Sequence, residues 1–385
     1  MRIVIDGRYI NDAFPGIGRY TYNLIVALAA TAGDDTLLVL TNSRLRNRRY
    51  DISRLAAPPA CRLVECPIDR FLPSELLYLA PAVRKLHPDL FHSPFFLRPY
   101  PLGCPCVQTI YDLQPMQAMD EHSRTDYILF RLGMHFAVRN AAAVLTISEQ
   151  SAREIRLHWP NSGDRIFVTP LAADKKFHPL PIQESQQSLH RLGLDGCRYV
   201  FHISSGLKHK NVGLLLRAWN DCLKDSCLMN WKLVLAGNFG QRREGYAALA
   251  RQLAIEGSIS FLGDIDEEAL VALYNRAELF VFPSSMEGFG LPVVEAMACG
   301  APVLTTDSIG VAPDLADAAW KIPPGNLGAL AGALKYLLVN EDVRHALSER
   351  GLMQAQNFSW RAAAEATWRV YRGIMYNRES YAGRH

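Results

Sequence analysis

The feature that most constrains the fold is a regular alternation of short apolar segments with longer helical patterns. The short segments are bounded by turn residues and rich in Val, Ile, Leu and Phe, as strands buried on both faces are. They lie at residues 2–6, 36–41, 89–93, 106–111, 142–148 and 165–170, and then at 198–204, 231–237, 259–263, 279–283 and 302–305. Helical patterns between them include 20–30, 126–140, 212–223 and 245–255. This alternation predicts parallel sheets covered by helices on both faces.

A polar stretch at residues 174–196, which contains Pro179 and Pro181, separates the two series of strands. A chain of 385 residues is long enough for two or three domains. We predict an α/β protein with a Rossmann-like domain over residues 1–172 and a second over 173–358. A terminal helix is expected over residues 359–385, with Ser359 as its N-cap. Ligands of such doubly wound domains bind in the cleft at the carboxyl ends of the strands.

The composition is that of an ordinary globular protein, with 49% hydrophobic and 21% charged residues. The formal net charge of +3 gives no domain-wide basic excess, so we do not expect a nucleic-acid partner. No uncharged apolar segment reaches the length of a membrane-spanning helix, and no signal peptide is evident, so we expect a cytoplasmic protein.

The cysteines support the same compartment. They lie at positions 61, 66, 104, 106, 197, 222, 227 and 299, and they form no CxxC pair. Cys104 and Cys106 flank Pro105, but a zinc site needs two further ligands. We therefore interpret the cysteines as reduced thiols.

The most informative segment covers residues 284–300 and follows a predicted strand. Gly288 and Gly290 allow a tight turn, and Pro292 suits the first turn of a helix. A helix that begins at 291 or 292 would direct unpaired N–H groups at a diphosphate. Glu287 lies before this helix and Glu295 is expected in its first turn; either carboxylate accepts two sugar hydroxyls. The alternative is a plain strand–turn–helix connection with a capping glutamate.

Glu287 and Glu295 form an E-x7-E pair inside Glu-Gly-Phe-Gly-Leu-Pro. This resembles the signature of the retaining glycosyltransferases of family 4, which have the GT-B fold. Further segments that resemble the family are residues 15–20, 210–211, 261–263 and 357–360, so the resemblance covers nearly the whole chain. It implies that the second domain binds a nucleotide-sugar donor and the first binds the acceptor. It also implies that the terminal helix over 359–385 crosses back to the first domain.

The resemblance also implies roles for residues of the second domain. Glu295 would bind the donor ribose, Glu287 the hydroxyls of the transferred sugar, and Lys210 the leaving phosphate. The amides that would meet the diphosphate belong to Gly288, Phe289, Gly290 and Leu291. Many relatives carry an arginine shortly before the lysine, where this chain has Ser204, Ser205 and Gly206. Lys208 is the nearest cation, and the alternative is a neutral hydrogen bond from Ser205 to phosphate.

The first domain contributes a glycine-rich segment with Gly16 and Gly18. Thr21 stands where a dinucleotide fingerprint would require a third glycine. We expect a flexible loop that opens a helix at Tyr20, with its amides and Arg19 facing the donor diphosphate or the acceptor.

Relatives usually carry a His-Asp pair at the end of a strand of the first domain. Here Tyr111 replaces the histidine, and Asp112 matches the aspartate. The hydroxyl of Tyr111 is a candidate donor to the transferred sugar. His92 is a second candidate near the cleft on the acceptor side, although a histidine at a strand end is as often structural.

We predict no catalytic metal and no cofactor. Asp264 and Asp266 form a DxD motif, which holds a metal ion in another glycosyltransferase fold. Because Asp266 precedes two glutamates and an apolar helical pattern, we interpret it as an N-cap.

A basic segment contains Arg44, Arg46, Arg48 and Arg49. It is either a solvated loop or a contact to an anionic membrane surface, which would suit a lipid-linked acceptor.

The function that these observations favour is a metal-independent retaining hexosyltransferase. It would transfer a hexose from a nucleotide-sugar, UDP-glucose before GDP-mannose, to a glycan acceptor such as a lipid-linked intermediate of a surface polysaccharide. The alternative is a catalytically weak GT-B subunit that binds a nucleotide-sugar or a partner transferase. Only Tyr111 favours the alternative.

Overall fold

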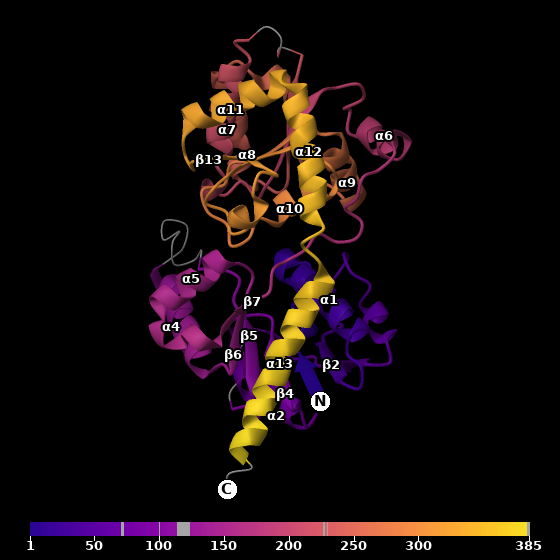
Figure 1. Ribbon diagram of the computed structural model, residues 1–385, viewed down its shortest axis with the longest axis vertical. Helices are drawn as coiled ribbons and strands as arrows, with labels where there is room; N and C mark the ends of the chain where they lie inside the picture. Colours follow the sequence, from indigo (N-terminus) through magenta and orange to yellow (C-terminus); the bar gives the residue numbers. More distant parts are fainter. Residues whose placement is uncertain (71–72, 100, 114–123, 226–227, 229, 383–385) are drawn as a thin grey trace. The chain divides into compact units, whose positions relative to one another are not determined.

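The computed structural model describes residues 1–70, 73–99, 101–113, 124–225, 228 and 230–382 (Figure 1). The chain divides into two compact units. The first unit comprises Met1–Leu171 and Ser359–His385, and the second comprises Ala172–Phe358. This division lies one residue from the predicted boundary at 172, and it assigns the terminal helix to the first unit. Among the described helices, none is both long and apolar enough to cross a membrane.

The first unit is built on a parallel sheet of seven strands in the order β3-β2-β1-β4-β5-β6-β7. The strands are β1 (Arg2–Ile5), β2 (Thr36–Thr41), β3 (Cys61–Glu65), β4 (Leu90–Ser93), β5 (Cys106–Thr109), β6 (Ala143–Thr146) and β7 (Ile166–Val168). Six of them were predicted. The seventh, β3, was missed because it is an edge strand whose Arg62 and Glu65 are exposed, so it lacks a continuous apolar run.

Helices cover this sheet, and the long helix α13 belongs to the same unit although it ends the chain (Figure 1). The α-helices are α1 (Pro15–Ala30), α2 (Pro73–Arg84), α4 (Arg124–Asn140), α5 (Glu149–His158) and α13 (Trp360–Ala382). Short 3-10 helices are η1 (Gly7–Tyr9), η2 (Ile52–Ala56) and η4 (Pro160–Arg165).

The start of α1 corrects the prediction for the glycine-rich segment. The helix begins at Pro15, not at Tyr20, so Gly16 and Gly18 lie in its first turn rather than in a flexible loop. Proline at the first helical position has its φ already set for a helix. A Cβ on Gly18 would lie 3.1 Å from the carbonyl oxygen of Tyr9, so this glycine permits close packing of α1 on η1.

A buried polar chain ties α13 to the sheet. His92 of β4 is fully buried, with Nδ1 2.6 Å from the hydroxyl of Tyr371 and Nε2 2.8 Å from Oγ1 of Thr109. The Thr109 oxygen lies in turn 3.1 Å from the hydroxyl of Tyr20 on α1. Burial lowers the pKa of His92 to about 3, which keeps the imidazole neutral. The structure thus gives His92 buried polar partners on β5 and α13, and its place among the acceptor-side candidates stays a prediction.

The second unit is built on a parallel sheet of six strands in the order β10-β9-β8-β11-β12-β13. The strands are β8 (Tyr199–Ile203), β9 (Lys232–Ala236), β10 (Ile259–Gly263), β11 (Leu279–Phe282), β12 (Val303–Thr306) and β13 (Trp320–Ile322). Only β13 was not predicted, because three residues are too few to form a recognisable apolar run.

The helices of the second unit cover both faces of its sheet. They are α6 (Ile182–Arg191), α7 (Val212–Cys222), α8 (Arg242–Gln252), α9 (Glu267–Arg276), α10 (Leu291–Ala298), α11 (Leu327–Val339) and α12 (Glu341–Ala355), with η5 (Lys208–Lys210), η7 (Glu256–Ser258) and η8 (Ala312–Leu315). Asp266 caps α9, since its Oδ1 accepts a 2.7 Å hydrogen bond from the amide of Ala269. This confirms the interpretation of the DxD motif as an N-cap.

The turn between β11 and α10 depends on one backbone conformation. Gly290 precedes the first residue of α10 and has φ +99°, which residues with a side chain rarely adopt. A Cβ at this position would lie 2.9 Å from Cδ1 of Ile309. The helix then begins at Leu291, with Pro292 in its first turn as predicted.

Replacing Tyr371 with phenylalanine should lower the free energy of unfolding of the first unit by about 1–3 kcal/mol, because a buried ring nitrogen of His92 loses its partner. The measurement is urea unfolding at pH 8, where His92 is neutral in both folded and unfolded chains. Tyr376→Phe on the exposed part of α13 is the matched control and should leave stability unchanged. Equal stability of the two variants would contradict the role assigned to this hydrogen bond.

Gly290→Ala should destabilise the second unit by about 1–3 kcal/mol, because alanine is strained at this positive φ. Thermal and urea unfolding of the two proteins give the comparison. Gly332→Ala in α11 is the control, since a Cβ there meets no atom within 4 Å. That control should match the parent or gain up to about 1 kcal/mol. A Gly290→Ala protein as stable as its parent would show that the turn tolerates a side chain.

Candidate functional site

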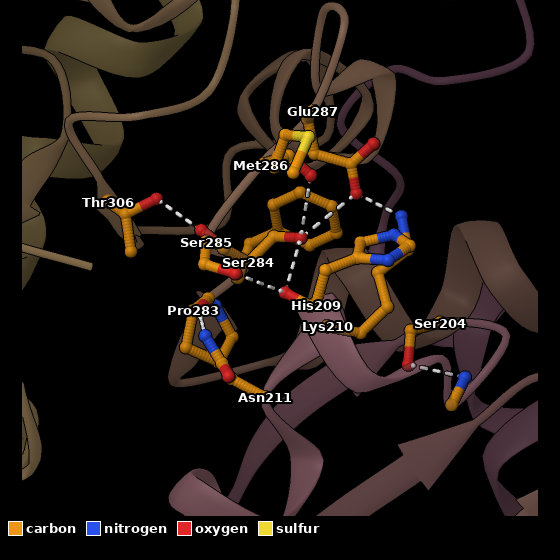
Figure 2. A network of polar contacts seen from close by, with 12 residues as sticks. Ser204, His209, Lys210, Asn211, Pro283, Ser284, Ser285, Met286, Glu287 and Thr306 are labelled. Atoms are coloured by element: carbon orange, nitrogen blue, oxygen red, sulfur yellow. Dashed lines mark hydrogen bonds and ion pairs between the residues drawn. The ribbon is translucent and has the colours of Figure 1, made fainter. Parts of the chain in front are cut away.

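Two neighbouring strands of the second unit position the main candidate residues. β8 and β11 pair in parallel, so the loops that follow them leave the same edge of the sheet. The loop after β8 ends in η5 with Lys210, and the loop after β11 carries Glu287. Nζ of Lys210 and Oε1 of Glu287 form an ion pair, although the two residues are 77 positions apart (Figure 2). The structure therefore brings together two residues that the sequence nominated separately.

The ion pair is largely shielded from water, since the two side chains are 15% and 13% exposed. Oε1 of Glu287 also accepts a 3.1 Å hydrogen bond from the hydroxyl of Ser284. Nζ of Lys210 lies 5.7 Å from the ring centroid of Phe282, within the range of a cation–π interaction. These contacts hold a carboxylate and an ammonium group side by side.

Backbone contacts fasten the two loops to each other. The carbonyl of His209 accepts a hydrogen bond from the amide of Ser285 at 2.8 Å, and its oxygen lies 3.1 Å from Oγ of Ser284. Asn211, in a left-handed conformation, donates from Nδ2 to the carbonyl of Pro283 at 2.9 Å (Figure 2). Thr306 donates to the carbonyl of Ser284 at 2.5 Å. No supporting role was predicted for these residues, although Asn211 belongs to the segment 210–211, and Ser284 and Ser285 to the segment 284–300, that the sequence analysis singled out.

The N-terminus of α10 follows Glu287 directly. The carbonyl of Glu287 accepts from the amide of Gly310 at 2.9 Å, and that of Phe289 accepts from the amide of Val311 at 2.8 Å. These bonds fix the turn and leave the positive end of the helix dipole at Leu291. The Phe289 side chain is buried against Phe358, so only the backbone of this residue is suited to a ligand.

Glu295 lies one turn further along α10 than predicted. It occupies the second turn of α10, not the first, because the helix begins four residues earlier at Leu291. Its side chain is buried, and the hydroxyl of Tyr274 donates to Oε2 at 3.4 Å. Tyr274 was not predicted as a site residue, because a tyrosine within an apolar helical pattern indicates a residue of the hydrophobic core.

The loop after β8 is shaped by a histidine that the sequence did not nominate. His202 is buried, which lowers its pKa to about 4, and its Nδ1 lies 2.9 Å from the carbonyl of Val281. A neutral ring that donates from Nδ1 must accept at Nε2, so we assign the 2.9 Å contact there to the hydroxyl hydrogen of Ser204. The Ser204 oxygen accepts from the amide of Gly206 at 3.2 Å. Ser204 thus shapes the loop, whereas Ser205 and Lys208 are exposed on it.

Apart from His92 on β4, the candidate residues of the first unit are divided between α1 and the segment that follows β5. The hydroxyl of Tyr111 donates to the carbonyl of Pro94 at 3.0 Å, and its ring packs edge-on against Tyr20. The hydrogen of that hydroxyl is therefore engaged by the backbone. Asp112 and Arg19 are partly exposed, Gly16 is exposed and Gly18 is buried.

The basic segment after β2 is held by Asp12. Oδ2 of this aspartate lies 3.9 Å from Nε of Arg46 and 3.8 Å from Nε of Arg48, and Oδ1 accepts from the amide of Arg48 at 3.0 Å. The amides of Arg44 and Arg49 bind the side chains of Asn42 and Asn47.

Within the described ranges, no group of three or more His, Cys, Asp or Glu side chains is arranged to hold a metal ion. The seven cysteines in these ranges form no disulfide, and Cys227 lies outside the described residues.

Comparisons with known proteins match both units. Residues 190–353 match the family model described as "Glycosyl transferases group 1", and residues 15–172 match "Glycosyl transferase 4-like domain". The O-antigen chain mannosyltransferase B of Escherichia coli is 28% identical, over 97% of this chain and 100% of its own length. A D-inositol 3-phosphate glycosyltransferase of Corynebacterium jeikeium is 29% identical over 61% of this chain, which spans 58% of that relative.

Solved structures give the fold. Sucrose-phosphate synthase from Thermosynechococcus elongatus superposes with a TM-score of 0.76 at 19% identity, over 98% of this chain and 100% of its own. With both halves matched, two doubly wound sheets in place and the E-x7-E glutamates on either side of the α10 N-terminus, the chain belongs to the group 1 glycosyltransferases of family 4 type and has the GT-B fold.

Proposed function

We propose that the protein is a metal-independent, retaining hexosyltransferase that uses a nucleoside-diphosphate sugar to extend a glycan of a surface polysaccharide. The observation that carries this proposal is the ion pair of Lys210 and Glu287 beside the N-terminus of α10. One group of the pair suits a phosphate and the other suits sugar hydroxyls, so together they match the two halves of such a donor.

The reaction breaks the bond between the anomeric carbon and the diphosphate oxygen. Negative charge then grows on the leaving diphosphate, where Lys210 and the amides at the start of α10 supply fixed positive charge. The acceptor hydroxyl forms the new bond on the same face of the sugar, and its proton passes to the leaving phosphate. No protein nucleophile is required, and the configuration at the anomeric carbon is retained.

The remaining groups bind the donor. Glu287 accepts hydrogen bonds from hydroxyls of the transferred sugar, and Glu295 accepts from the ribose. Tyr274 orients the Glu295 carboxylate through its 3.4 Å hydrogen bond. Ser205 and Lys208, which are exposed on the loop that His202 and Ser204 shape, would contact phosphate.

The transferred sugar is proposed to be mannose. The relative that matches along its whole length is named for mannose transfer to an O-antigen chain. This favours GDP-mannose over UDP-glucose, reversing the order expected from the sequence alone. The acceptor is proposed to be a growing glycan, carried on a lipid.

A catalytically weak subunit is the second candidate function. It is favoured by Tyr111, which stands where relatives carry a histidine and gives its hydroxyl hydrogen to Pro94. Such a subunit would bind a nucleotide-sugar or a partner transferase without turnover.

The proposal is tested by calorimetry and turnover of the purified full chain in EDTA, with GDP, UDP, ADP, GDP-mannose and UDP-glucose and a mannoside as acceptor. We expect tight binding of one nucleotide family and a product whose anomeric NMR signal matches that of the donor. An inverted product would contradict retention, and activity abolished by EDTA would contradict metal independence. Nucleotide binding without turnover would favour the weak subunit, and no binding at all would overturn the donor site.

Substitution of Lys210 should mainly lower kcat, whereas substitution of Glu295 should mainly weaken donor binding. Lys210→Ala should lower kcat by about 10²–10³, because its charge stabilises the transition state more than the bound donor. Glu295→Gln should instead weaken donor affinity by about 10–150-fold, the range for a hydrogen bond to a charged group. Lys224→Ala, which removes an exposed lysine of the same unit, is the control and should change neither value. Equal losses of rate and affinity in Lys210→Ala would reduce Lys210 to a binding role.

A further inference from the structure

The backbone of Glu287 is fixed by the chain segment that follows β12. Its carbonyl accepts the 2.9 Å hydrogen bond from the amide of Gly310, and the residue forms an isolated parallel bridge with Ile309. Its side chain is held as well, because Oε1 accepts the 3.1 Å hydrogen bond from Ser284 (Figure 2). We therefore expect the carboxylate of Glu287 to keep its position when a ligand enters the site.

The side chain of Lys210 has more freedom than that of Glu287. Its backbone is fixed, since its amide donates to the carbonyl of Leu207 at 2.9 Å, but its charge lies at the end of a long flexible stem. Rotation of this stem can move Nζ from Glu287 to a neighbouring phosphate while the backbone stays in place. The ion pair thus has one fixed member and one adjustable member.

Within the part of the chain that the structure describes, Lys210 is the one cation that pairs with Glu287. Both side chains are largely shielded, so water can replace a lost partner only in part. A phosphate that draws Lys210 away leaves Glu287 as a poorly solvated charge. It also places a second negative charge near this carboxylate, and like charges repel.

The donor and the product of the proposed reaction differ in what they offer to Glu287. A nucleoside-diphosphate sugar brings a phosphate for Lys210 and hydroxyls for Glu287 at the same time. A nucleoside diphosphate, which remains after the transfer, brings only the phosphate. Binding of the product therefore breaks the ion pair without giving Glu287 a new partner.

We propose that the ion pair of Lys210 and Glu287 makes the site select the intact donor and expel the product nucleotide. This inference rests on the proposed function, because it takes the donor to be a nucleoside-diphosphate sugar. Once the sugar has left with the acceptor, Glu287 competes with the product diphosphate for the ammonium group of Lys210. An unpaired charge in the unwanted complex is a general source of specificity, so Glu287 distinguishes the donor from its own product.

The test is calorimetric titration of the full chain with GDP and GDP-mannose, or with UDP and UDP-glucose if the chain binds uridine nucleotides. The parent should bind the sugar nucleotide about tenfold more tightly than the diphosphate. Glu287→Gln keeps the shape of the side chain and removes its charge. It should bind the diphosphate about tenfold more tightly than the parent does, an effect between those of exposed and buried ion pairs. Its affinity for the sugar nucleotide should not rise, because an amide is a weaker acceptor for sugar hydroxyls.

Glu256→Gln is the matched control. It removes an equal charge from an exposed position of the same unit, on η7. This variant should bind the diphosphate and the sugar nucleotide as the parent does. Circular dichroism and thermal unfolding establish that both variants are folded before they are titrated.

A second measurement uses the parent chain alone, so it does not depend on the folding of a variant. Free mannose, or free glucose with uridine nucleotides, supplies hydroxyls to Glu287 without a phosphate. A high concentration of the free sugar should therefore strengthen binding of the diphosphate. By linkage, the diphosphate should strengthen binding of the free sugar by the same factor.

Four outcomes would overturn the proposal. They are equal affinity of the parent for diphosphate and sugar nucleotide, unchanged or weaker diphosphate binding by folded Glu287→Gln, an equal gain in Glu256→Gln, and diphosphate binding that the free sugar does not strengthen. Any of these together with turnover of the sugar nucleotide would leave the transferase proposal standing. Absence of binding by all of these nucleotides would overturn both proposals.

Discussion

The parallel pairing of β8 with β11 is the constraint on which the candidate site depends. β8 is the first strand of its sheet, and the chain adds β9 and β10 on one side of it before β11 starts the other side. The loops after β8 and β11 therefore leave the sheet where the strand order reverses, which is where ligands of such sheets bind. Lys210 lies on one loop and Glu287 on the other, and their ion pair joins the two loops.

The ion pair of Lys210 and Glu287 is largely shielded from water, so each charge depends on its partner. A largely buried carboxylate or ammonium group without a partner destabilises the fold, so removal of one partner leaves the other as an unpaired buried charge. In the proposed function, a donor that enters the site offers phosphate to Lys210 and hydroxyls to Glu287, so both charges keep partners throughout. The bonds from Ser284, Asn211 and Thr306 hold the loops in place before any ligand arrives. Electrostatic stabilisation is strongest where groups are fixed in advance in this way.

Much of this architecture could be predicted because buried parallel strands leave a plain apolar record. That record fails at β3 and β13, which are an exposed edge strand and a strand of three residues. Contacts between distant segments left no local signal at all. The sequence could not indicate that His92 meets Tyr371, that His202 meets the carbonyl of Val281, or that Tyr274 meets Glu295. Each depends on two elements packing together, which only the three-dimensional fold determines.

Helix α4 illustrates the same limit for surfaces. Its pattern contains more apolar residues than one core-facing stripe needs, and they divide between two faces. Met134, Ala137 and Val138 are buried against the sheet side of the first unit, whereas Leu132 and Phe136 are exposed on the other face. Periodicity records that both faces are apolar, but not which of them the fold covers.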